Sequence, residues 1–161
     1  MAILQKLKEH FSRDSVTLDL QDIQALILRS RPEPYVGVHA MLHFDEAAGA
    51  RNLLGRLAPH IASADNWSED LDFWIGAALS FEGLKALGVP DAQLKTFPLP
   101  FQQGMAARAE QLRDFGPNAP ENWEDVFKPG NCHLALTIYA VDDDALDKAL
   151  ATARTELDRS S

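Results

Sequence analysis

The sequence predicts an α+β fold, arranged as a ferredoxin-like β-α-β-β-α-β unit with an antiparallel sheet. Two observations carry this prediction. The stretches 35–44, 72–81 and 132–141 alternate apolar with other residues at the two-residue period of strands. Most segments between and after them carry apolar residues at the three- and four-residue spacing of amphipathic helices. Helices that cover one face of such a sheet are typical of α+β proteins.

Length and composition are those of a globular protein. No repeat, low-complexity tract or linker divides the 161 residues, so we expect one domain spanning residues 1–161. Lys and Arg number 15 against 24 Asp and Glu, which gives a net charge of −9. Nucleic acid and anionic membranes attract basic surfaces, so the composition argues against both as partners.

The features that report on location favour the cytoplasm. Cys132 is the only cysteine, so the chain can form no internal disulfide. Residues 1–15 contain basic side chains but no continuous apolar stretch of a secretory signal. No window approaches the roughly 20 apolar residues that cross a bilayer. We therefore expect a cytoplasmic protein.

The first elements are two helices and a strand. Periodic apolar residues predict a short helix over 3–11 and a second one over 18–27. Pro32 and Pro34 end the second helix, because proline cannot continue it. The alternation over 35–44 then predicts a strand.

A second helix–strand pair follows. Asp45 is a candidate N-cap for a helix that extends to Leu57. The weakly patterned segment Ile61–Trp67 is expected to form a short edge strand, which the β-α-β-β-α-β order requires. The run Asp72–Phe81 predicts the next strand.

The remaining chain contains a long excursion before the last strand. Gly88 is expected to end a short helix over 82–87 in the left-handed conformation. Residues 91–130 form a long excursion rich in Pro and Gly, in which we expect one helix, around Met105–Leu112. The strand 132–141 follows, and Asp142–Asp144 favour the start of a final helix by capping and dipole interactions.

One face of the predicted sheet is too apolar and aromatic for simple exposure to water. We expect it to contact another domain or subunit, while the face with Leu134, Leu136 and Ile138 packs on helices. The alternation fixes only which residues share a face. The candidate interface residues are Tyr35, His39, Met41, His43, Trp74, His133 and Tyr139.

The same residues do not predict a metal or catalytic site. His39 and His43 lie roughly 13 Å apart along a strand, too far to bind one metal together. His133 could lie beside one of them across strands, which gives two ligands at most. The sequence contains no phosphate-binding loop and no nucleophile elbow. We expect no catalytic, cofactor-binding or metal-binding residue.

Three segments carry a family resemblance. The first and most specific, Phe97–Trp123, reads FPLPFQQGMAARAEQLRDFGPNAPENW; the other two are Gly83–Gly88 and Leu18–Gln24. Together they resemble the N-terminal half of dye-decolourising (DyP-type) haem peroxidases. The resemblance implies two ferredoxin-like halves in the intact enzyme, with haem associated mainly with the C-terminal half. A glycine followed by small residues in Gly104–Arg108 would let a ligand or another backbone approach closely, and we expect this segment to support a neighbouring domain rather than to bind a ligand directly.

The resemblance does not extend to the family's haem residues. These are a distal aspartate in a G-x-x-D-G motif, a distal arginine and a proximal histidine. Residues Gly88–Ala92 read GVPDA, which departs from the motif at its last position, so Asp91 is not assigned a catalytic role. We expect this chain alone to bind no haem and to be inactive.

The sequence leaves three functions open. The leading one is the non-haem-ligating half of a DyP-type peroxidase, as a fragment, a split half or a degenerate relative. Its partner would be the C-terminal haem-bearing half. The second is a stand-alone, non-catalytic module that associates with a second copy of itself. The third is a small ferredoxin-like dimer that binds haem or another ligand between subunits.

Overall fold

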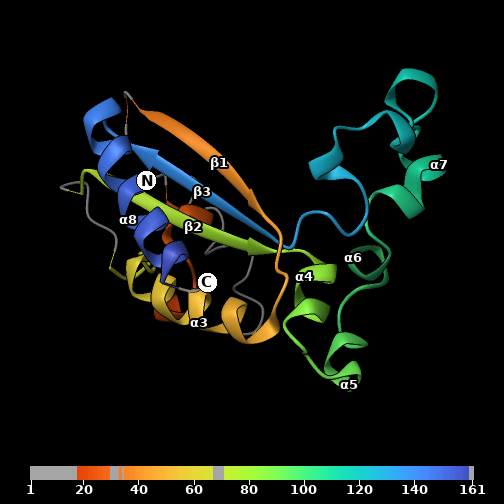
Figure 1. Cartoon of the computed structure of the whole chain (residues 1–161), viewed down its shortest axis with the longest axis horizontal. Coiled ribbons are helices and arrows are strands. Elements are labelled where there is room, and N and C mark those ends of the chain that lie inside the picture. The colour runs from red at the N-terminus through yellow and green to blue at the C-terminus, as the bar shows by residue number, and fades with distance from the viewer. Residues whose placement is uncertain (1–17, 30–32, 34, 67–70, 160–161) are drawn as a thin grey trace.

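The computed structural model describes residues 18–29, 33, 35–66 and 71–159. Three strands of this part form one sheet: β1 (Val36–Leu42), β2 (Phe73–Leu79) and β3 (Leu134–Ala140). The central strand β3 is antiparallel to both neighbours, and the order is β1-β3-β2. Figure 1 shows helices α3 and α8 against one side of this sheet, with the excursion projecting from one end. The predicted α+β, ferredoxin-like class is confirmed.

The core lies between the sheet and the two long helices, α3 (Ala47–Leu57) and α8 (Asp143–Asp158). Leu134, Leu136 and Ile138 of β3 are at most 1% exposed, so the prediction that this face packs on helices is confirmed. The helices contribute buried residues that are mostly leucine on α3 and alanine on α8. Small side chains on α8 let its backbone approach the sheet closely.

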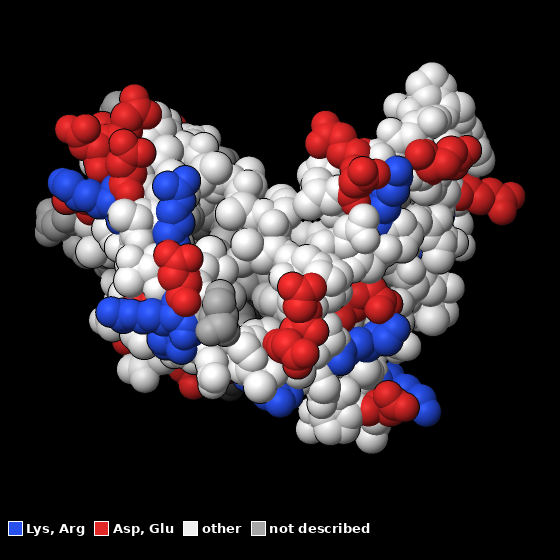
Figure 2. Space-filling view, in the orientation of Figure 1, with Lys and Arg blue, Asp and Glu red and all other residues white. Residues whose placement is uncertain are grey.

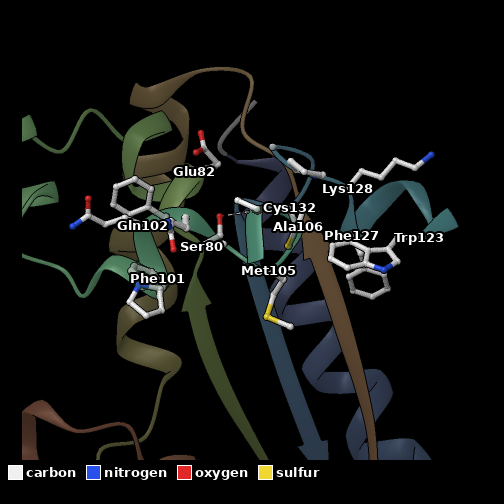
Figure 3. A pocket seen from close by; sticks show the side chains of 17 residues that line it. Ser80, Glu82, Phe101, Gln102, Met105, Ala106, Trp123, Phe127, Lys128 and Cys132 are labelled. Carbon is white, nitrogen blue, oxygen red and sulfur yellow. Dashed lines mark hydrogen bonds between the residues drawn. The ribbon is translucent and has the colours of Figure 1, made fainter. Parts of the chain in front are cut away.

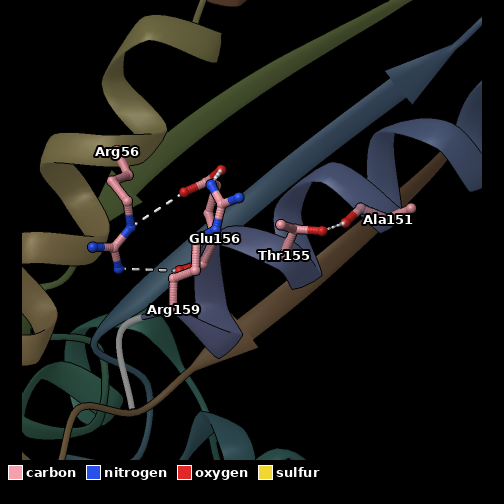
Figure 4. Close-up of polar contacts among 5 residues, drawn as sticks. All are labelled: Arg56, Ala151, Thr155, Glu156 and Arg159. Atoms are coloured by element: carbon pink, nitrogen blue, oxygen red, sulfur yellow. Dashed lines mark hydrogen bonds and ion pairs between the residues drawn. The ribbon is translucent and has the colours of Figure 1, made fainter.

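A buried carboxylate connects the two helices. Glu156 of α8 is 8% exposed, and its Oε2 lies 3.2 Å from Nε of Arg56 on α3. Arg56 also donates to the Glu156 backbone carbonyl at 3.2 Å, and Arg159 lies 3.3 Å from Oε1 (Figure 4). The charge of the carboxylate is therefore compensated where α3 and α8 meet.

Of the three helix ends predicted from the sequence, two agree with the structure. Asp142 caps α8 by accepting a hydrogen bond from the Ala145 amide at 2.9 Å. Gly88 adopts a φ of 76° after α4, as predicted for a left-handed terminator. The N-cap prediction for Asp45 is wrong, because α3 begins later, at Ala47, and Glu46 occupies the cap position without a side-chain bond.

The predicted edge strand at 61–67 is also wrong over its described residues. A 3-10 turn at Ala58–His60 precedes it, and Ser63 forms only an isolated bridge with Gln24. The long helix expected over 18–27 is replaced by a 3-10 turn at Leu20–Asp22 and a single helical turn, α2 (Ala25–Leu28). Trp67 and the helix expected over 3–11 lie outside the described residues.

Tertiary contacts explain why the second helix is short. The side-chain amide of Gln24 donates to the Ala77 carbonyl at 2.7 Å and accepts from the Ala77 amide at 2.8 Å. Gln24 thus occupies the outer edge of β2 as a neighbouring strand would, and its backbone is extended rather than helical.

The segment between β2 and β3, which consists of α4 and the excursion, holds four short helices joined by turns. Its turns include 3-10 segments at 106–108, 116–118, 120–122 and 125–127. The helix expected around 105–112 is present as one such turn followed by α7. The helices are α4 (Phe81–Ala86), α5 (Asp91–Leu94), α6 (Leu99–Gln103) and α7 (Ala109–Leu112).

Candidate protein interface

The sheet face opposite α3 and α8 brings the predicted interface residues together. Tyr139 is at the centre: its ring meets Tyr35 edge-on at 5.2 Å and His39 at 6.2 Å. Trp74 is the cross-strand partner of Tyr139 on β2. At the far end of β1, the rings of His43 and His133 stack with centroids 4.1 Å apart. The expectation that His133 could lie beside His39 or His43 is therefore confirmed, and His43 is the neighbour.

Two of the seven residues are not available to a partner. Trp74 is 1% exposed and His133 is 7% exposed within this chain. The segment around α2 covers part of β2 on this side, where Leu26 packs over Gly76, two residues from Trp74. The candidate surface is thus reduced to the exposed and half-buried members, which we call the sheet patch: Tyr35, His39, Met41, His43 and Tyr139.

His133 connects three parts of the chain. Its backbone amide donates to Leu42 at the end of β1 (2.8 Å), and its carbonyl accepts from Ser80 at the end of β2 (3.0 Å). Its ring Nδ1 accepts from the Phe44 amide at 2.9 Å. We call these contacts the His133 junction.

The electrostatics of the junction favour a neutral His133. Burial, followed by the charge of His43, lowers the pKa of His133 below its ordinary value, against weaker raising effects from Glu82, Gly130 and Asp45. Because Nδ1 accepts from a backbone amide, the neutral ring carries its proton on Nε2. His43 has its Nδ1 3.3 Å from the Asn131 carbonyl, which fixes it as the Nδ1–H tautomer.

The junction also requires a glycine in α4. A Cβ at Gly83 would overlap the carbonyl group of His133, so no larger residue fits without a backbone shift. The Gly83 amide donates to the Ser80 hydroxyl at 2.9 Å, and that hydroxyl donates to the Cys132 carbonyl at 2.7 Å. The start of α4 is therefore held against residues 132–133.

A second apolar surface lies on the excursion. Of the eleven large hydrophobic side chains exposed in the described part of the chain, seven fall between residues 97 and 127. A concentration of this kind marks a contact surface more often than free solvent exposure. We call these residues the arm patch: Phe97, Leu99, Phe101, Met105, Leu112, Phe115 and Phe127.

A pocket of about 640 Å³ lies where the arm patch meets the end of the sheet, and its lining includes Phe101, Met105 and Phe127 of the arm patch. Aromatic and thioether side chains line it, with Met105 and Cys132 between Phe101 on one side and Phe127 on the other (Figure 3). The Cys132 sulfur lies 3.7 Å from the Met41 sulfur, so the pocket adjoins the sheet patch. Figure 2 shows the corresponding hollow between the two lobes, with mainly uncharged atoms at its floor.

Metal ligands are not clustered in the described part of the chain. No group of three His, Cys, Asp or Glu side chains there could hold a metal ion. The pocket lining includes no histidine, and Nδ1 of the nearby His133 accepts a hydrogen bond from the Phe44 amide.

Sequence reasoning missed the arm patch. Its apolar residues follow no helical or strand period, and they are separated by prolines and glycines. The signal in the sequence that could have indicated this surface was the number of phenylalanines in a segment without periodicity.

Among the described residues, no helix is both long and apolar enough to span a bilayer.

Comparison with known protein families shows to which family this chain belongs. A family model described as the DyP dimeric alpha+beta barrel domain matches residues 46–161. The chain belongs to this DyP family. The match includes Phe97–Trp123, the segment that carried most of the resemblance. No curated protein matches the sequence.

Solved DyP structures share the fold. A decolorizing peroxidase from Auricularia auricula-judae superimposes with a TM-score of 0.73 at 22% identity, over 89% of this chain and 31% of its own. An ancestral D-type dye decolorizing peroxidase gives 0.73 at 26% identity, over 86% and 31%. The Auricularia enzyme in complex with imidazole gives 0.72 at 23%, over 89% and 31%. This chain spans about a third of the length of these peroxidases.

Proposed function

We propose that this chain acts as the non-haem-ligating half of a DyP-type peroxidase, where it provides a scaffold and an interface. One observation carries the proposal: the chain aligns over 89% of its own length with a DyP peroxidase, but over only 31% of that enzyme. The partner is then a haem-bearing half that corresponds to the rest of such an enzyme. In that assembly the other half supplies the haem and its peroxide chemistry.

The two apolar patches support a protein partner. Tyr, Phe and Met are enriched in the cores of protein interfaces, and both patches consist largely of them. The Met41–Cys132 contact joins the sheet patch to the pocket beside the arm patch, so one partner can cover both.

A second candidate is a self-associating module. The matching family model is described as a dimeric barrel domain, which favours a second copy of this chain over the same sheet patch. Both candidate functions use the sheet patch as the binding surface. They differ in the partner, which is a haem-bearing half in the first and a second copy of this chain in the second.

Sedimentation velocity with matched variants tests the proposal. The probe is the part of a DyP peroxidase that lies outside the alignment, expressed separately and loaded with haem. Wild-type chain is expected to bind it one to one. Met41→Lys in the sheet patch and Met105→Lys in the arm patch should each weaken binding about thirtyfold, which corresponds to an interface hot spot of about 2 kcal/mol.

The control is Ala48→Lys, which adds the same charge at an exposed position of α3. It should bind as the wild type does. Failure of the wild-type chain to bind, or equal binding by all variants, overturns the proposal. Self-association that the two methionine variants abolish, without binding to the haem-bearing probe, supports the dimeric module instead.

A further inference from the structure

We infer that the His133 junction is a proton-sensitive switch, in which acid detaches Phe44 from His133 and weakens the proposed interface. The detachment follows from the contacts of the ring alone. Its effect on binding rests on the proposed function, so the two parts are tested separately.

The neutral ring of His133 carries its proton on Nε2, because Nδ1 accepts the Phe44 amide proton at 2.9 Å. An added proton can therefore bind only at Nδ1. The resulting N–H would face the N–H of Phe44, and two donors at this distance cannot share a hydrogen bond. Protonation and the Phe44 bond exclude each other.

The surroundings provide little compensation for a charged His133. His43 stacks on it at 4.1 Å, and the charge of His43 lowers the pKa of His133 by repulsion. Glu82 of α4 already forms an ion pair with Lys85 at 2.9 Å, and Asp45 is exposed to solvent. Burial and repulsion consequently dominate.

The position of the junction links this local change to the interface. Phe44 is 9% exposed and belongs to the core cluster that contains Leu87 and Leu134. Residues 130–133 are where the excursion rejoins the sheet, and Cys132 contacts Met41 there. Release of Phe44 therefore loosens the connection that aligns the arm patch with the sheet patch.

Nuclear magnetic resonance of the intact chain tests the structural step. Long-range ¹H–¹⁵N spectra at pH 7.5 should show the Nε2–H tautomer for His133 and the Nδ1–H tautomer for His43. After correction for intrinsic exchange, hydrogen-exchange protection of the Phe44 amide should fall about tenfold between pH 7.5 and pH 5, as expected for one lost hydrogen bond. An Nδ1–H tautomer at His133, or unchanged protection, overturns the inference.

Two variants distinguish the effect of His133 protonation on the Phe44 amide from other effects of low pH. His133→Asn retains an acceptor for the Phe44 amide but cannot titrate, so its protection should be independent of pH after the same correction. His60→Gln, which replaces an exposed histidine outside the junction, should behave as wild type. The same pH dependence in His133→Asn contradicts the inference. If that variant does not fold, the wild-type tautomers still decide the question.

Binding of the haem-bearing probe at both pH values tests the linked step. We expect wild-type affinity to fall about tenfold at pH 5 and His133→Asn affinity to stay constant. If Phe44 responds to pH but no binding occurs at either pH, the proposed function fails while the switch stands. If binding occurs equally at both pH values and Phe44 does not respond, the switch fails while the proposed function stands.

Discussion

At the scale of single residues, His133 shows how one buried polar side chain organises the end of the sheet. Sequence reasoning placed His133 on the correct face and allowed for its pairing with His39 or His43. It could not choose between them, because the choice depends on the β1–β3 register, which pairs Leu42 with Leu134. It also could not foresee the Phe44 contact, which depends on a non-local backbone position.

The lowered pKa of His133 predicts a pH-dependent stability. In the unfolded chain the imidazole has an ordinary pKa of about 6.5, whereas in the folded chain it is lower. The unfolded state therefore binds more protons between these two values, and the free energy of unfolding falls as the pH decreases below about 6.5. Urea unfolding at pH 7.5, 6.5 and 5.5 measures this decrease. His133→Asn should reduce it; an identical decrease in wild type and variant would contradict the assignment.

Gly83 and Gly55 form a matched pair of glycines in helices. Gly83→Ala places a Cβ against the backbone of His133, and we expect a loss of about 1–3 kcal/mol in the free energy of unfolding. Gly55→Ala on α3 meets no atom within 4 Å and should stabilise the protein by roughly 0.5–1 kcal/mol through helix propensity. Chemical denaturation measures both values. Equal effects at the two positions would show that the junction tolerates movement.

At the scale of elements, the strands and long helices were predictable because each has one buried face. The alternation at 35–44, 72–81 and 132–141 predicted β1, β2 and β3 to within about two residues. The segment 61–67 failed because weak alternation cannot make a strand without a neighbouring strand to pair with. The helix expected over 18–27 failed because Gln24 bonds to the edge of β2 instead of continuing a helix.

Gln24→Ala tests the role assigned to that edge contact. The substitution leaves the amide and carbonyl of Ala77 without the side-chain partner, so we expect a loss of about 1–3 kcal/mol in the free energy of unfolding. Gln21→Ala is the control, since Gln21 is exposed and makes only a long side-chain contact of 3.4 Å to Asp65. Thermal unfolding compares the two. A loss no larger than that of the control would show that water replaces Gln24 at the strand edge.

The buried carboxylate between α3 and α8 gives a second prediction at this scale. Glu156→Ala leaves Arg56 with no carboxylate in a site that is largely closed to water, and should lower the free energy of unfolding by about 1–3 kcal/mol. Asp147→Ala removes an exposed carboxylate from the same helix and should change it by less than about 0.5 kcal/mol. Urea titrations resolve the difference. Similar effects would mean that the ion pair contributes no more than a surface charge.

At the scale of the whole molecule, the chain has a well-packed layer of sheet and helices beside a lobe with an exposed apolar surface. The sequence predicted the fold class and the family, because periodicity and the Phe97–Trp123 segment are local signals. It did not predict how the arm patch and the sheet patch adjoin. That arrangement depends on where the excursion leaves and rejoins the sheet, which only the three-dimensional contacts of residues 80–83 and 130–133 define.

Peroxide-dependent dye oxidation tests the central claim most directly, namely that this chain supplies structure and not haem chemistry. The purified chain is incubated with haem and assayed alone, then assayed with the haem-bearing remainder of a DyP peroxidase. We predict no haem-dependent turnover by the chain alone, because the sequence contains no G-x-x-D-G motif and the pocket lining includes no histidine. Adding the chain should raise the activity of the haem-bearing part. Turnover by the chain alone within a few fold of an intact family member would contradict the account.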